Sequence, residues 1–457
     1  MSDTEALMWT VEHDPALRSD FCNLTVVDAP IDFERLQDKL LNIIQAIPRL
    51  GQRVVPAPLG VATPEWVDVD IDVSYHLRRV TLARPGTERQ LLDACALLAD
   101  APFDRDRPLW QFTVFDGLAD GGGALLQKMH HTITDGVGGM KLSLHIVDFE
   151  AHPRPNAASH RPEPRGAAAT HNPSLLNSAR HALSDATKNT FTRTASALAN
   201  TGRVITDPRG APARIGDMFA MASSLRRQVL VTERSHSDLI DDRSLQRHFE
   251  LVRFPLPVAK AAARELGGSL NDLFVTFVAD ALGRYHRELG STVTELRMAM
   301  PVNKRDVSRS SANEFAPSRV VVPISSGPLR ARFDDVRQRL EVTKRERSLG
   351  ATSGLAAFVT ALPNAAIIAA ARNQTRTIDF ATSNLRGSPV PLFLVGSRIV
   401  ANYPLGPRTG CALNISLLSY CDELHLGLNL DPAAISDIPL FLRELRAAFD
   451  EVCAQAV

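Results

Sequence analysis

One short run constrains this chain more than any other feature of its sequence. Residues 129–139 read Met-His-His-Thr-Ile-Thr-Asp-Gly-Val-Gly-Gly, between an apolar strand-like run and a helix-like run. Side chains alternate across a strand, so His130 and His131 are expected to point to opposite faces of a sheet. A histidine at a strand end, where a glycine-rich turn begins, is well placed to act as a general base. The run therefore predicts an acid–base site at the end of a strand.

The residues that follow the two histidines are interpreted as structural residues that shape the turn. Asp135 lies four residues after His131, beyond the strand end, where it is poorly placed to hold a catalytic imidazole. We interpret it as a carboxylate that fixes the turn, for example by pairing with an arginine. Gly136 and the glycines after it allow a sharp turn and a close approach to a ligand. The alternative is a simple strand-to-helix turn with incidental histidines.

Other reaction chemistries fit the sequence less well. A zinc site needs ligands that converge, whereas two adjacent strand residues diverge, and there is no His-Glu-x-x-His or closely spaced cysteine pair. The chain lacks a Gly-x-Ser-x-Gly nucleophile elbow, a phosphate-binding P-loop and a dinucleotide fingerprint. The sequence therefore predicts no metal and no nucleotide cofactor.

Composition indicates an intracellular enzyme. Lys and Arg number 51, as do Asp and Glu, so no net charge attracts nucleic acid. Five widely spaced cysteines favour a reducing compartment, and the acidic N-terminus resembles no signal peptide. We therefore expect a cytoplasmic protein. The apolar tract 355–371 is shorter than the roughly 20 residues of a membrane span; a pair of core helices is expected there, with an acyl-chain-lining role as the alternative.

The secondary-structure pattern divides the chain into two α/β parts joined by a linker. The predicted domains cover residues 1–152 and 231–457, and residues 153–230 form a Pro- and Ala-rich linker with crossover helices. Helices are predicted at 33–47, 88–98, 136–149 and 438–456. Strands are predicted at 23–27, 110–115, 124–131, 249–254, 297–301, 320–324, 395–400, 412–419 and 424–430.

A further polar pair begins an apolar helix near residue 270. Ser269 is a natural N-cap, and Asp272 three residues later suits the positive end of the helix dipole. Asn271 offers a side-chain amide that can donate to a developing oxyanion at the same helix end. Helix capping alone also explains Asp272, so both interpretations stay open for it.

Together these motifs resemble those of the bacterial wax ester synthase/acyl-CoA:diacylglycerol acyltransferase family, a branch of the CoA-dependent acyltransferases that includes chloramphenicol acetyltransferase. Besides His-His-x-x-x-Asp-Gly, the matching blocks lie at residues 102–110, 269–272, 382–393, 419–420 and 431. Two stretches depart from the family: residues 19–24 replace its Pro-Met-His-Val-Gly block, and Ala312-Asn313 replaces its Gly-Asn.

The resemblance implies two chloramphenicol acetyltransferase-like domains of mixed α/β sheets, with an active-site channel between them. It implies an O-acyltransferase in which His131 is the general base and Asn271 helps to stabilise the oxyanion. His130, Asp135 and Gly136 complete the catalytic motif. The resemblance assigns substrate binding to Pro108, Leu109, Trp110, Asp272 and Glu12. For Glu12 two roles stay open, orienting the catalytic imidazole or lying on the surface.

The resemblance also implies the substrates. Acyl-CoA is expected as the co-substrate, with no resident cofactor, and the acceptor is a lipid alcohol: diacylglycerol, giving triacylglycerol, or a long-chain alcohol, giving a wax ester. Peripheral contact with the inner membrane or with lipid bodies is compatible with this activity. One alternative is a related acyltransferase that uses a glycolipid or polyketide acceptor or an acyl-carrier donor. Another is a non-catalytic lipid-binding relative.

Overall fold

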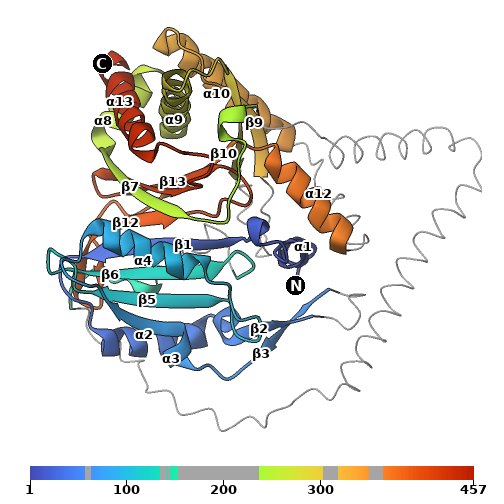
Figure 1. The fold of residues 1–457 in the computed structure, drawn as a ribbon. Coiled ribbons are helices and arrows are strands. Elements are labelled where there is room, and N and C mark those ends of the chain that lie inside the picture. Colours follow the sequence, from blue (N-terminus) through green and yellow to red (C-terminus); the bar gives the residue numbers. More distant parts are fainter. Residues whose placement is uncertain are drawn as a thin grey trace, which may run out of the picture.

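Two six-stranded sheets form the framework of the computed structural model (Figure 1). The structure describes residues 1–56, 63–133, 142, 145–152, 236–301, 317–348 and 364–456. Helices cover the face of the second sheet that points away from the first sheet, whereas the helix Glu88–Asp100 packs between the first sheet and the strand His248–Pro255 of the second. The N-terminal segment lies beside the second half of the chain. This arrangement confirms the predicted two-domain α/β class.

The first sheet is built mainly from the first part of the chain. Its strand order is β11(Phe393–Leu394)-β12(Ser397–Leu405)-β1(Asp20–Val27)-β6(Gly123–His130)-β5(Trp110–Asp116)-β4(Leu77–Thr81). The helices of this part are α1(Asp3–Val11), α2(Phe33–Ala46), α3(Val73–His76) and α4(Glu88–Asp100). The strands β2(Gln52–Val55) and β3(Glu65–Asp68) form a separate two-stranded ribbon.

The second sheet comes entirely from the later part of the chain. Its strand order is β7(His248–Pro255)-β14(Glu423–Leu430)-β13(Leu413–Tyr420)-β10(Phe380–Arg386)-β8(Glu295–Pro301)-β9(Pro317–Pro323). Its helices are α8(Leu256–Glu265), α9(Leu270–Glu288), α10(Leu329–Ser348), α12(Asn364–Arg376) and α13(Ile438–Ala456). Short 3₁₀ turns lie at Pro15–Leu17, Pro48–Gly51 and Asp238–Ile240.

The two sheets repeat one pattern of strand directions. In the first, β1 pairs antiparallel with β6, β6 antiparallel with β5, and β5 parallel with β4. In the second, β7, β14, β13 and β10 show the same succession of antiparallel, antiparallel and parallel pairs. The chain visits the four strands in the same order in both halves. This confirms the prediction of two domains with similar topology.

One crossing joins the two halves. The strands β11 and β12 lie within the predicted second domain, 231–457, yet β12 pairs with β1 in the first sheet. Its outer edge contacts β13 and β14 of the second sheet, and the backbone N–H of Asn402 donates to His425 Nδ1 at 3.2 Å. Sheet membership therefore does not follow the predicted boundary at residue 231.

Two predicted elements end differently from the expectation. Asp148 forms a single bridge with Phe393, so the helix predicted for 136–149 does not reach residue 149, while residues 136–141 lie outside the described chain. The strand predicted for 395–400 begins at Ser397, because Val395 and Gly396 both have positive φ and form the turn between β11 and β12. The predicted linker and residues 355–363 of the apolar tract also lie outside the described residues.

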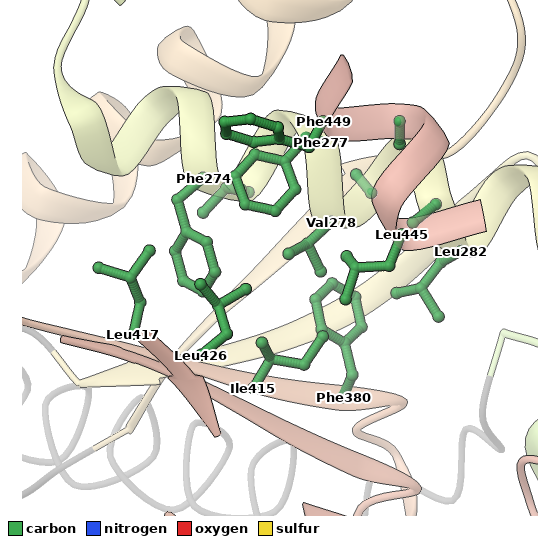
Figure 2. Packing of buried hydrophobic residues seen from close by; sticks show 14 of the residues in the cluster. Phe274, Phe277, Val278, Leu282, Phe380, Ile415, Leu417, Leu426, Leu445 and Phe449 are labelled. Atoms are coloured by element: carbon green, nitrogen blue, oxygen red, sulfur yellow. The ribbon is translucent and has the colours of Figure 1, made fainter. Parts of the chain in front are cut away.

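The largest core lies between the second sheet and its helices (Figure 2). Helix α9 buries an apolar stripe against β10, β13 and β14, and Phe277 packs edge-to-face against Phe449 of α13. The helix begins with a capping box, in which Ser269 and Asp272 each accept a backbone hydrogen bond from the other. No helix among the described residues is long and apolar enough to cross a membrane.

Candidate active site

The backbone of the two motif histidines is hydrogen-bonded to residues on both sides of β6. The N–H of His130 donates to the carbonyl of Leu109 on the β5 side at 3.0 Å, and the N–H of His131 donates to Ser19 on the β1 side at 3.2 Å. Because the two side chains alternate, they meet different surroundings. His130 packs edge-to-face against Trp9, whereas the His131 ring lies 4.9 Å from that of Phe21. This agrees with the predicted divergence of the two side chains.

The His130 imidazole is engaged at both nitrogens. The backbone N–H of Thr132 donates to Nδ1 at 3.1 Å, which makes Nδ1 an acceptor and places the proton of the neutral ring on Nε2. That nitrogen then donates to Glu12 Oε2. The ring is 1% exposed. Since each nitrogen already has a protein partner, His130 offers no free lone pair to a substrate.

Glu12 reaches the motif from the N-terminal helix. It caps the C-terminus of α1, which packs against α12 of the second half, and its side chain is 10% exposed. Two residues later, Asp14 forms an ion pair with Arg372 of α12 at 3.4 Å. The carboxylate is therefore a fixed partner of a motif histidine, His130 rather than His131, and its part in the reaction stays a prediction.

Replacing Glu12 by Gln should lower both stability and turnover. The amide keeps the shape but removes the charge that accepts the proton of His130 Nε2, and a charge-assisted hydrogen bond contributes about 1.5–3 kcal/mol. A thermal melt beside a CoA-release assay checks this. The control is Glu34→Gln at the first turn of α2, an exposed carboxylate whose loss should lower stability by less than about 1 kcal/mol and leave turnover unchanged. Normal melting and turnover for Glu12→Gln would contradict the assignment.

The Pro-Leu-Trp block supports the histidine strand. Trp110 is fully buried, donates from Nε1 to the Leu50 carbonyl at 2.9 Å and stacks on His76 at 4.4 Å. Leu109 packs with Trp9 and supplies the carbonyl that accepts from His130. Pro108 is buried beside them. In these contacts the block frames the histidine motif, and its predicted substrate contact remains a proposal.

Asn271 and Asp272, the two polar residues at the start of α9, have different hydrogen-bond partners. Both Asp272 hydrogen bonds serve the cap, with Oδ2 accepting from Ser269 N at 2.8 Å and from Ser269 Oγ at 2.7 Å. Asn271 instead accepts from Asn384 Nδ2 at 3.3 Å. Asn384 belongs to the late block 382–393, so two of the sequence motifs meet here. The capping interpretation thus accounts for Asp272, and Asn271 is the member of the pair that reaches another motif.

The remaining motif blocks also meet one another. Gly387 allows close approach to β13, because a Cβ there would lie 2.3 Å from the Ser419 carbonyl oxygen. The hydroxyl of Tyr420 accepts from Leu392 N at 2.9 Å and donates to Ile399 O at 3.1 Å. Asp431 pairs with Arg408 at 2.5 Å. Asp135 and Gly136, by contrast, lie outside the described residues.

A buried ion-pair cluster beside the histidines was not predicted. Asp20, opposite His130 in the β1–β6 register, binds Arg247 of the second half through two hydrogen bonds of 2.8 and 3.0 Å. Arg247 also pairs with Asp100 at 3.0 Å. Asp20 falls in the stretch 19–24 that departs from the family block, and no motif surrounds Arg247. The only sequence signal was an acidic residue at the start of an apolar strand.

The described residues hold no group of three or more His, Cys, Asp or Glu side chains that could bind a metal ion. Two stacked α/β halves, with adjacent histidines at the end of strand β6, have the two-domain fold of wax ester synthase/diacylglycerol acyltransferases and of condensation domains. Residues 1–274 match the wax ester synthase/diacylglycerol acyltransferase catalytic domain, and residues 312–452 match the WS/DGAT C-terminal domain. The chain belongs to this family, as its motifs predicted, and it is an acyltransferase.

Individual relatives align with all or nearly all of this chain. A Mycobacterium tuberculosis protein named as a diacylglycerol O-acyltransferase is 29% identical over 100% of this chain and 92% of its own, and another is 30% identical over 90% and 86%. Among solved structures, the wax ester synthase/diacylglycerol acyltransferase of Marinobacter aquaeolei VT8 aligns with a TM-score of 0.65 at 19% identity, covering 99% of this chain and 98% of that one. A starter condensation domain of rhizomide synthetase in complex with C8-CoA and Leu-SNAC aligns with a TM-score of 0.57 at 13% identity, covering 100% and 94%.

Proposed function

We propose that this chain transfers a fatty acyl group from acyl-CoA to the hydroxyl of a lipid, with His131 as the general base. The observation that carries the assignment is the contrast between the two histidines. Both nitrogens of His130 are occupied by Thr132 and Glu12, so the ring serves as a fixed support. His131 lies on the other side of the strand end and takes the catalytic role by elimination within the motif.

The reaction needs only proton transfer and charge stabilisation. Neutral His131 accepts the proton of the acceptor hydroxyl while that oxygen attacks the thioester carbonyl. The tetrahedral oxyanion is stabilised by nearby donors, among them the amide of Asn271. Collapse breaks the carbon–sulfur bond, and the leaving CoA thiolate takes the proton back from the imidazolium. The thioester is already activated, so we propose no cofactor, metal or covalent acyl-enzyme. A channel between the two halves would bring donor and acceptor to His131.

The acceptor is the open part of the proposal. Diacylglycerol would yield triacylglycerol and a long-chain alcohol would yield a wax ester; the names of the mycobacterial relatives favour the first. A glycolipid or polyketide acceptor, or an acyl-carrier donor, is the alternative within the same chemistry. We place the enzyme in the cytoplasm, with peripheral contact to the inner membrane or lipid bodies where its acceptor gathers. The test is CoA release with a panel of acceptors; release with none of them would favour a non-catalytic lipid-binding role.

Replacing Asn271 by Ala should separate catalysis from stability. The loss of one oxyanion donor costs about 10²–10³-fold in turnover, while the α9 cap, formed by Ser269 and Asp272, stays intact. The matched variant is Asp272→Ala, which breaks the capping box. It should lower the free energy of unfolding by about 1 kcal/mol and the melting temperature with it. Turnover and thermal melts of both variants check the assignment. An early-melting but active Asn271→Ala would return Asn271 to a structural role.

A further inference from the structure

The start of β1 contacts His131 in two ways. Asp20 lies opposite His130 in the register of β1 and β6. Ser19, one residue earlier, therefore lies opposite His131, one residue later, because the two strands are antiparallel. The carbonyl of Ser19 accepts the backbone N–H of His131 at 3.2 Å, and the Phe21 ring lies 4.9 Å from the imidazole. Both the backbone and the ring of His131 thus depend on where β1 begins.

Asp20, between those two contacts, connects the start of β1 to the second half of the chain. Its carboxylate accepts hydrogen bonds from both Nη atoms of Arg247, at 2.8 and 3.0 Å. Two parallel hydrogen bonds fix the angle between the groups as well as their distance. Both side chains are buried, and Arg247 directly precedes β7 of the second sheet. An arginine of the second half therefore fixes the position at which β1 starts.

Arg247 has a second carboxylate partner, and this one lies on another element. Its Nε pairs at 3.0 Å with Oδ1 of Asp100, the last residue of α4. The Asp100 side chain is 37% exposed. Its backbone carbonyl, which a side-chain substitution keeps, accepts from Arg18 Nη1 at 2.7 Å. The Asp100 side chain thus shares Arg247 with Asp20 but makes no contact in the path that leads to His131.

Loss of the Asp20–Arg247 pair would act first on the end of the ladder that holds His131. The bond between Ser19 and His131 is the terminal one, whereas the pairing of β1 with β6 continues for eight residues, to Val27. A terminal bond opens before the bonds inside a strand pair. A displacement of about 1 Å at a reacting group can cost about 10²-fold in rate. The competing explanation is that the pair only stabilises the junction of the two halves.

We propose that Asp20 and Arg247 are positioning residues through which the second half of the chain fixes the His131 imidazole for catalysis. This inference rests on the proposed role of His131 as general base, and it adds two residues that touch no reacting atom. Asp20 lies in the stretch 19–24 that departs from the family block, and Arg247 lies in none of the motif blocks. The sequence motifs therefore do not account for this pair.

The test is a double-mutant cycle between Asp20→Asn and His131→Ala. Turnover is measured with oleoyl-CoA and the best acceptor of the panel, at a temperature where all variants are folded. Asp20→Asn alone should lower kcat by about 10–10²-fold and leave the KM of oleoyl-CoA unchanged. In the His131→Ala background the same change should cause no further loss, because a base that is absent cannot be displaced.

Two matched variants separate positioning from stability. Asp100→Asn removes the other carboxylate that pairs with Arg247 and should leave kcat close to the wild-type value. Arg247→Lys keeps the charge but loses the planar fork that binds Asp20, so it should lower kcat as Asp20→Asn does. It also replaces Asp20→Asn in the cycle if that variant does not fold. Amide hydrogen exchange of His131 gives a readout without activity: it should be faster in Asp20→Asn and unchanged in Asp100→Asn.

The outcomes are distinguishable. An equal loss of kcat from Asp20→Asn in both backgrounds would overturn the inference, as would an equal loss in Asp100→Asn. Unchanged exchange of the His131 amide in Asp20→Asn would also overturn it, because the pair would then not control the strand end. Wild-type protein that releases no CoA with any acceptor, or His131→Ala with near-normal turnover, would instead refute the proposed function. In that case faster exchange in Asp20→Asn would still support the structural link.

Discussion

Replacing His131 by Ala should reduce acyl transfer by about 10²–10⁴-fold, the usual contribution of a general base. The proton of the acceptor hydroxyl would then have no acceptor in the transition state, while binding of the thioester would be retained. The readout is CoA release under saturating oleoyl-CoA, together with the dissociation constant of the donor. We expect turnover to fall and donor affinity to stay the same.

The neighbouring histidine supplies the control for that experiment. His130→Ala removes the partner of Glu12 Oε2 and of the Thr132 N–H, so it should melt earlier and lose activity only in proportion to its unfolding. Assays at a temperature where both variants are folded separate the two effects. Near-normal turnover in His131→Ala, with a stable but inactive His130→Ala, would reverse the roles of the two residues.

Breaking the ion pair between Asp20 and Arg247 should cost up to about 3–5 kcal/mol, because the buried Arg247 would keep only the more exposed Asp100 as a partner. The two side chains are 3% and 10% exposed, and Arg247 joins the second half of the chain to the strand opposite His130. Asp20→Asn should therefore lower the free energy of unfolding, measured in denaturant, and turnover with it. The matched control is Glu341→Gln in the exposed pair with Arg345, which should change stability by less than about 1 kcal/mol.

The same pair makes an acid-dependent prediction. Burial alone would raise the pKa of Asp20, but the charge and hydrogen bonds of Arg247 outweigh it and lower the pKa below its usual 3.8. A lowered pKa stabilises the folded state above the unfolded pKa, and this stabilisation is lost as the pH falls through the folded pKa. The stability gap between wild type and Asp20→Asn should thus be full at pH 6 and shrink below about pH 4. A gap that stays constant with pH would contradict the pairing.

Much of the secondary structure could be predicted from local patterns. The helix predicted for 438–456 and the strands near 110–115, 249–254 and 424–430 agree with the structure to within one or two residues at each end. Their apolar periodicity and their turn residues act over short distances, so they are readable in one sequence. The prediction erred at residues 395–396, where two positive φ values place a turn inside an apolar run that reads as a strand.

The sequence by itself determined the family, the α/β class and the histidine motif, because each depends on residues close together in the chain. Only the tertiary structure decided which partners these residues have. It placed Glu12 on His130, joined Asp20 to Arg247 across 227 positions, and inserted β12 into the sheet of the other half. Those contacts depend on the packing of the two halves. The residues next to a carboxylate or an arginine in the sequence do not indicate which distant group will neutralise its charge.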